Sequence, residues 1–291
     1  MRLGRFSYRA CTTVAEAVGQ MTEHGEDALM IAGGTVVVPM MKHRLVAPDI
    51  LVSLAEIREL HRIDAEDGRL RIGASVTHRE LAESPQVLRH APLLADACGR
   101  VASPVIRAMG TIGGNVSYGE SASDPPAALL ALGASVTLTG PNGTREVPLR
   151  DFYVDFYETE RADDEVVVDV VVPFAPDDAE HLYVKWTPRS REDKPLVGLA
   201  VSMRREANHC ERLRVGLSGA SHTPCLLDAA STALTGAVLD AESIAHAAAL
   251  AAGEITPFDD AQGSAGYRRE MVEVWFARAL NELLGRASWD K

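Results

Sequence analysis

Two short glycine loops constrain this chain more than any other feature. The first is Ala32-Gly33-Gly34-Thr35, and the second is Gly110-Thr111-Ile112-Gly113-Gly114-Asn115. Adjacent glycines mark places where the backbone turns sharply or approaches another group closely, because glycine has no Cβ and accepts positive φ. Successive N–H groups in such loops can converge on an anion. Two loops of this kind predict a ligand with a central pyrophosphate and two ends.

Composition limits the possible partners and the compartment. The 291 residues carry a formal net charge of −12, which disfavours nucleic acid and anionic membranes as partners. No apolar run reaches the length of a membrane span of about 18 residues, and the N-terminus lacks the apolar core of a signal peptide. The four cysteines include no Cys-x-x-Cys pair, so we expect free thiols, no iron–sulfur cluster in this chain and a cytoplasmic location.

Several common catalytic motifs are missing from the sequence. It contains no Gly-x-Gly-x-x-Gly, no Gly-Lys pair, no His-Glu-x-x-His and no Gly-x-Ser-x-Gly. His209-Cys210 with His222 and Cys225 is the one Cys/His cluster, and it lacks the spacing of metal ligands. We therefore predict no metal site and no catalytic residue in this chain.

Hydrophobic patterns predict an α+β chain with a change of pattern after residues 173–178. The first part mixes short strands, helices and a hairpin over 134–147, whereas the second reads as a three-stranded antiparallel sheet backed by helices. The three strands are expected at 182–186, 197–204 and 213–219, and helices at 226–234, 241–252 and 267–284. A single longer helix is expected over 86–98, and Asp124 is expected to cap a helix that ends before Gly133.

The segment after the first loop can be interpreted in two ways. Val36-Val37-Val38 is strand-like by propensity, but Pro39 argues against a central strand and is tolerated in a first helical turn. The alternatives are therefore a strand or a helix over residues 36–44.

The loops and their flanks resemble one family. Ala32 to Pro39 followed by Met40-Met41-Lys42 looks like the first FAD loop of the molybdenum hydroxylase flavin subunits, and Thr111-Ile112-Gly113-Gly114-Asn115 looks like the second. Ser123-Asp124-Pro125, the stretch from Ala127 to Gly133 and the strand with Lys185 match in the same order. The chain resembles the FAD-binding medium subunits of the xanthine dehydrogenase and carbon monoxide dehydrogenase family along nearly its whole length.

The resemblance implies a fold and a domain division. A two-part FAD-binding domain of the vanillyl-alcohol-oxidase type would span 1–174, with subdomains 1–55 and 56–174, and a sheet-and-helix domain would span 175–291. It also favours a helix after the first loop, with its N-terminus toward the pyrophosphate.

The resemblance also implies a cofactor site. FAD would be bound non-covalently, with Lys185 near the flavin ring, where a cation stabilises the reduced anion. Many members carry an aromatic residue where this chain has Lys194. The implied cofactor-binding residues are Ala32, Gly33, Gly34, Thr35, Val36, Ala102, Gly110, Thr111, Gly114, Asn115, Ser123, Asp124 and Lys185.

Partner chains follow from the same resemblance. A large subunit would carry the molybdenum cofactor and a small subunit two 2Fe–2S clusters, in a dimer of heterotrimers. Electrons would pass from molybdenum through the clusters to FAD and then to an external acceptor. Two alternatives stay open: a cofactor-free structural subunit of such a complex, which the intact glycines argue against, and a stand-alone flavin oxidase, which the absence of a substrate base disfavours.

Overall fold

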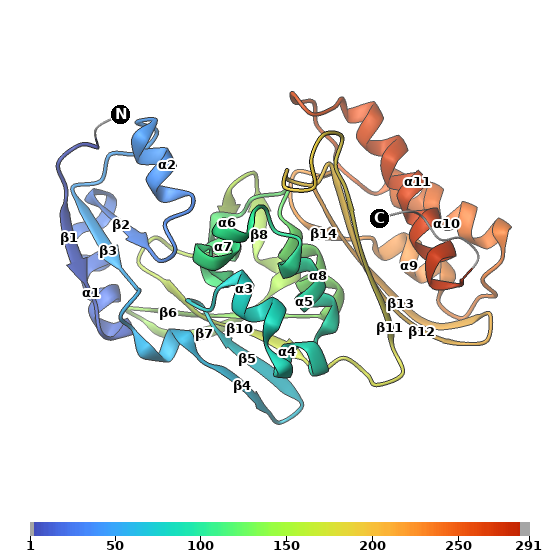
Figure 1. Cartoon of the computed structure of the whole chain (residues 1–291), viewed down its shortest axis with the longest axis horizontal. Coiled ribbons are helices and arrows are strands. Elements are labelled where there is room, and N and C mark those ends of the chain that lie inside the picture. Colours follow the sequence, from blue (N-terminus) through green and yellow to red (C-terminus); the bar gives the residue numbers. More distant parts are fainter. Residues whose placement is uncertain (1–2, 286–291) are drawn as a thin grey trace.

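The N-terminal lobe is a small parallel sheet covered by one helix. The computed structural model describes residues 3–285 and places this lobe at the left of Figure 1. The elements are β1 (Ser7–Ala10), α1 (Val14–His24), η1 (Gly25–Asp27), β2 (Ala28–Ile31), α2 (Val37–Lys42) and β3 (Ile50–Ser53), with strand order β1-β3-β2. Thr13 caps α1, whose face of Val14, Ala17, Val18 and Met21 is buried.

The central part is a five-stranded antiparallel sheet, order β4-β5-β10-β6-β7, covered by short helices. Its strands are β4 (Ile63–Glu66), β5 (Arg69–Gly73), β6 (Ser135–Gly140), β7 (Gly143–Pro148) and β10 (Val166–Pro173), with a separate hairpin of β8 (Tyr153–Asp155) and β9 (Glu158–Thr159). Its helices are α3 (His78–Glu83), α4 (Pro85–His90), α5 (Pro92–Gly99), α6 (Pro104–Met109), α7 (Ile112–Tyr118) and α8 (Asp124–Leu132), with 3₁₀ turns η2 (Arg58–His61) and η3 (Leu149–Asp151).

The C-terminal part is a four-stranded antiparallel sheet with helices packed against it, at the right of Figure 1. Its elements are β11 (Glu180–Trp186), β12 (Val197–Glu206), β13 (His209–Ser218), β14 (Cys225–Leu226), α9 (Asp228–Leu234), α10 (Ala241–Gly253) and α11 (Ala265–Leu283). The predicted three-stranded sheet was wrong by one strand. Cys225 and Leu226 pair with Leu217 and Gly216, and α9 begins only after this short strand.

Helix α8 joins the central and C-terminal parts. Every residue from Asp124 to Leu132 is buried, and α8 packs against α5 on one side and against β12 and β13 on the other. A Cβ on Gly216 of β13 would lie 2.9 Å from the carbonyl carbon of Ala127, so only glycine allows this close approach. The first residues of α8 are thereby held in a fixed position.

Proline residues explain where two of the expected helices begin and end. The single helix expected over 86–98 is two helices, because Pro92 begins α5 and Ala91 before it has φ −145°. Residues 37–42 form the helix α2 with Pro39 in its first turn, so the strand propensity of the valines is overridden.

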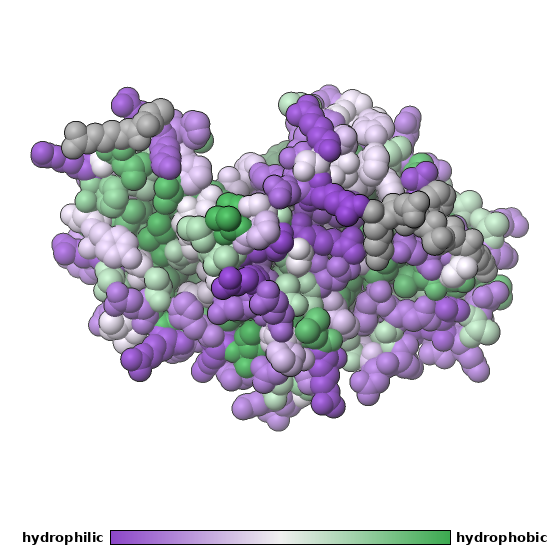
Figure 2. Space-filling view, viewed as in Figure 1, coloured by the Kyte–Doolittle hydropathy of each residue, from purple (hydrophilic) through white to green (hydrophobic). Residues whose placement is uncertain are grey.

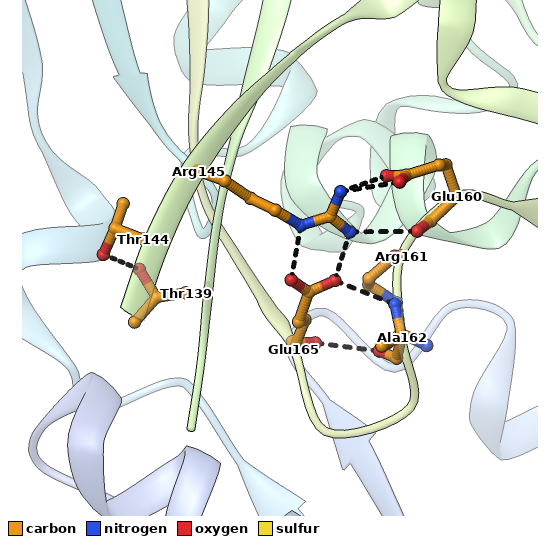
Figure 3. Close-up of polar contacts among 7 residues, drawn as sticks. All are labelled: Thr139, Thr144, Arg145, Glu160, Arg161, Ala162 and Glu165. Carbon is orange, nitrogen blue, oxygen red and sulfur yellow. Dashed lines mark hydrogen bonds and ion pairs between the residues drawn. The ribbon is translucent and has the colours of Figure 1, made fainter. Parts of the chain in front are cut away.

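An arginine fastens the β6–β7 hairpin to the turn before β10 (Figure 3). Arg145 of β7 donates to both carboxylate oxygens of Glu165 at 2.6 Å and to both of Glu160 at 2.6 and 2.7 Å. The hydrogen bonds from Arg145 lower the pKa of the Glu165 carboxyl.

Replacing Glu165 with glutamine tests this contact through pH. A carboxyl whose folded pKa is lowered stabilises the fold above its unfolded pKa, and this contribution is lost as the pH falls through the folded pKa. We expect Glu165→Gln to lower the free energy of unfolding by about 1 kcal/mol at neutral pH, a modest value because the arginine is partly exposed. The variant should lose less stability than the wild type on acidification, as chemical denaturation would show. Glu160→Gln, at a more exposed carboxylate, serves as the control with a smaller effect.

Within residues 3–285, no helix is long and apolar enough to cross a membrane.

Candidate functional site

The two glycine loops meet in the structure although some 75 residues separate them in the sequence. A Cβ on Gly33 would lie 2.7 Å from the carbonyl carbon of Met109 and would overlap its oxygen. It would also lie 3.2 Å from the Cα of Gly110, the first residue of the second loop. Gly34 has φ +68°, in the left-handed region that favours glycine. The loops therefore pack against each other at Gly33.

The first loop presents a run of free backbone donors. Within the described chain, the N–H groups of Gly33, Gly34, Thr35, Val36 and Val37 have no hydrogen-bond acceptor. These residues are only partly buried, so their donors can reach a ligand. A row of unsatisfied N–H groups that leads into a helix attracts an anion. Figure 2 shows the surface hollowed between the lobe that carries this loop and the central part.

The second loop uses its N–H groups differently. Ile112 and Gly113 donate to the carbonyl oxygens of Val76 and Ala74, both at 2.9 Å. Gly114 donates at 3.2 Å to the hydroxyl of Thr111, which caps α7. The expectation of converging N–H groups is therefore wrong for the second loop, whose donors at residues 112–114 are already engaged. The second loop is pinned to the central sheet and presents the exposed Gly114 as a surface without a side chain.

Asn115 and Ser123 form a reciprocal pair beside this loop. The Asn115 amide donates to the Ser123 hydroxyl at 2.7 Å, and the hydroxyl lies 3.0 Å from the amide oxygen. The pair ties the second loop to the start of α8. Ser123 is the N-cap residue of α8, but its hydroxyl makes no capping bond because it is engaged with Asn115.

The predicted role of Asp124 as a helix cap was wrong. Asp124 is the first residue of α8, and its carboxylate points to β11 instead. It accepts from the Tyr183 hydroxyl at 2.6 Å and from the Lys185 ammonium at 3.0 Å, with both charged side chains 5% exposed. Burial raises the pKa of the Asp124 carboxyl, and Lys185 opposes this rise. The two residues form a buried ion pair.

Besides Asp124, Lys185 also contacts a strained segment that contains Ala102. Its φ of +38° is rare for a residue with a Cβ. Arg107 of α6 holds this conformation by donating to the carbonyl oxygens of Val101 and Ala102 at 2.8 and 2.7 Å. Lys185 donates at 2.7 Å to the carbonyl oxygen of Arg100 in the same segment.

These contacts close into a ring that joins the two loops to Ala102, Lys185 and the start of α8. Gly33 of the first loop packs on Met109 of α6, and Arg107 of the same helix donates to the Ala102 carbonyl. Lys185 donates both to the Arg100 carbonyl and to Asp124. Ser123, which precedes Asp124 in the chain, pairs with Asn115 of the second loop.

Tyr183 and Arg107, which hold this ring together, were not among the predicted site residues. Tyr183 could have been found, because it lies two residues before Lys185 on one strand and so shares its face. Arg107 had no comparable signal, because its role depends on the turn at Val101 and Ala102.

Comparisons with known proteins decide the family. Residues 4–175 match the FAD binding domain in molybdopterin dehydrogenase, and residues 183–283 match the CO dehydrogenase flavoprotein C-terminal domain. The chain belongs to the FAD-binding medium subunits of molybdopterin dehydrogenases. It is the flavoprotein subunit of an oxidoreductase complex.

Similar proteins cover nearly the whole of this FAD-binding subunit. The carbon monoxide dehydrogenase medium chain of Afipia carboxidovorans is 35% identical over 98% of both chains. The nicotine 6-hydroxylase medium subunit of Paenarthrobacter nicotinovorans is 30% identical over 97% of this chain and 98% of its own. A solved structure of carbon monoxide dehydrogenase from Hydrogenophaga pseudoflava superimposes with a TM-score of 0.95 at 35% identity, covering 99% of this chain and 100% of the other.

The residues present in this subunit fit a dinucleotide cofactor. The five free N–H groups suit a pyrophosphate, which a chain of net charge −12 would otherwise repel. The absence of a side chain at Gly33 lets the first loop pack directly on the Met109 carbonyl, so that these N–H groups lie beside the second loop.

Proposed function

We propose that this subunit accepts electrons from the 2Fe–2S clusters of a small partner chain and passes them to an external acceptor. The clusters would be reduced by a large partner chain that holds the molybdenum cofactor and selects the organic substrate. The family supports this division, and so does the absence of cysteine-cluster motifs from the sequence. We further propose a dimer of heterotrimers located in the cytoplasm, where the four cysteines would stay as thiols.

The ring of contacts would hold FAD non-covalently. The backbone of Ala32 to Val36 would bind the pyrophosphate through its free N–H groups. Thr111, Gly114 and Asn115 of the second loop would contact the cofactor, and Ala102 and Gly110 would form the adjoining surface. Ser123 and Asp124 would accept hydrogen bonds from the hydroxyl groups of the cofactor. FAD supplies the exchange of electrons singly or in pairs. Lys185 would place its positive charge beside the flavin ring, and its hydrogen bonds to Asp124 and the Arg100 carbonyl would orient it.

We propose the domain division expected from the sequence, with an FAD-binding domain over 1–174, its subdomains 1–55 and 56–174, and a C-terminal domain over 175–291. The two family matches fall on either side of residue 180, in support of this boundary.

The run of free N–H groups at the meeting point of the loops carries this proposal, and an FAD titration tests it. Addition of FAD to the cofactor-stripped chain should quench flavin fluorescence and saturate at one FAD per chain. If the chain is folded by circular dichroism and no FAD binds, the subunit is the cofactor-free structural alternative. FMN, which lacks the pyrophosphate and adenosine, is the matched control ligand and should bind far more weakly.

A further inference from the structure

Arg268 of α11 is a charged residue buried among loop backbone. It is only 1% exposed, and it donates to the carbonyl oxygen of Phe258 at 3.0 Å and to that of Gly219 at 2.5 Å. Its Nη2 lies 2.6 Å from the Asp260 carboxylate, and the guanidinium carbon lies 4.2 Å from the centroid of the Phe258 ring. This planar group therefore fixes the turn after β13 and the loop between α10 and α11 at once, which an apolar side chain could not do.

Gly219, in the turn after β13, is held on both sides of its Cα. Its carbonyl oxygen accepts from Arg268, and its own N–H donates to the carbonyl oxygen of Ser121 at 2.8 Å. Ser121 is 2% exposed and comes two residues before Ser123 and three before Asp124 in the chain. The contacts therefore lead from α11 through the protein interior to the start of α8.

The conformation of Gly219 explains why the arginine contact matters. Its φ is +84°, and a Cβ would lie 2.9 Å from the carbonyl oxygen of Leu196, so this position requires glycine. Glycine is also the residue with the greatest backbone freedom, so its N–H keeps one direction only while hydrogen bonds restrain the residue. Arg268 supplies that restraint at the carbonyl, and the N–H consequently stays directed at Ser121.

We propose that Arg268 is a positioning residue for the cofactor site, which it stabilises through the backbone of Gly219 and Ser121. By fixing this turn it holds Ser123 and Asp124 where they can meet the cofactor. The inference rests on the proposed function, since those two residues are taken to bind FAD. Within the described chain, the hydrogen bonds of Arg268 reach none of the proposed cofactor-binding residues, so its effect on FAD is indirect.

Hydrogen–deuterium exchange of the FAD-free chain tests the restraint on Gly219. Arg268→Lys keeps a positive charge near Asp260, but an ammonium group lacks the fork that reaches two carbonyl oxygens and a carboxylate together. We expect the Gly219 amide to exchange about tenfold faster in this variant, because the turn opens locally more often. Overlapping peptides across residues 216–222 resolve this amide by mass spectrometry.

FAD binding tests the consequence for the site. Arg268→Lys should lower FAD affinity by about tenfold in a fluorescence titration and should change the visible circular dichroism of the bound flavin. Phe276→Leu is the matched control, because Phe276 is also buried on α11 and makes no hydrogen bond to the turn. This control should lose stability in urea denaturation and keep the wild-type FAD affinity, flavin spectrum and Gly219 exchange.

Asp260→Asn is a milder variant that weakens only the ion pair of Arg268, and it should lower FAD affinity by about threefold. It decides the question by the same measurements if Arg268→Lys does not fold. Wild-type exchange at Gly219, or faster exchange with FAD affinity no lower than in Phe276→Leu, would overturn the inference. Failure of the wild-type chain to bind FAD would instead overturn the proposed function, because the exchange is measured without the cofactor.

Discussion

Gly33→Ala should lower FAD affinity by at least about 100-fold, because the added Cβ would overlap the Met109 carbonyl. The obstacle is backbone, so a rotamer change cannot remove the overlap and the two loops must move apart. The N–H groups of the first loop would then no longer face the second loop. Fluorescence titration with FAD measures the loss, and circular dichroism verifies that the chain is folded.

Gly34→Ala is the matched control, since it adds the same single carbon to the neighbouring residue. Its Cβ would find ordinary contacts of 3.4 Å with Ile31 and Val38, and its cost comes only from φ +68°. That strain is about 1–2 kcal/mol, so the affinity should fall by about tenfold. Gly34→Val should be worse, because a β-branched residue at positive φ is more strained. Equal FAD affinity in Gly33→Ala and the wild type would refute the assignment of this surface.

Lys185→Met should destabilise the fold by about 3–5 kcal/mol, because it leaves the buried Asp124 carboxylate without its cation. FAD affinity should fall as well, since Lys185 also orders the Arg100 carbonyl. Burial would then raise the pKa of Asp124 further, because only the Tyr183 hydrogen bond and the charge of Arg100 would still oppose the rise. A carboxyl with a raised folded pKa destabilises the fold at high pH, and this cost disappears as the pH falls toward its unfolded pKa. The deficit of Lys185→Met should therefore shrink on acidification.

Asp124→Asn completes a double-mutant cycle with Lys185→Met. Each single variant should lose stability in urea denaturation, and the double variant should lose less than the sum, because no unpaired charge remains buried. Tyr183→Phe is the control that removes one hydrogen bond and leaves both charges, with a loss of about 1.5–3 kcal/mol. Additive losses in the cycle would show that the two side chains are not coupled.

The glycine loops could be predicted from the sequence because their signal is local. Adjacent glycines after a buried strand already indicate a tight turn and a close approach. The helix after Val36 required the resemblance, since valine propensity and Pro39 pointed in opposite directions. The break at Pro92 was readable but overlooked, because an apolar pattern continues through it.

The contacts of Asp124 could not be predicted in the same way. Local rules favour aspartate as a cap before Pro125, whereas the structure turns it toward a strand some 60 residues later. The packing of α8 on the C-terminal sheet determines which side chains contact Asp124. That packing depends on long-range contacts such as Gly216 against Ala127. The fourth strand was missed for a related reason, since two residues carry no detectable alternation.

The role as an electron-exit subunit is tested most directly by anaerobic mixing with substrate. The flavin absorbance of the isolated, FAD-loaded chain should remain unchanged with heterocycles, aldehydes and carbon monoxide. The complex reconstituted with its molybdenum and iron–sulfur chains should show loss of that absorbance with its own substrate. Loss of flavin absorbance, or steady turnover, by the isolated chain with any of these compounds would contradict the account and favour a stand-alone flavin oxidase.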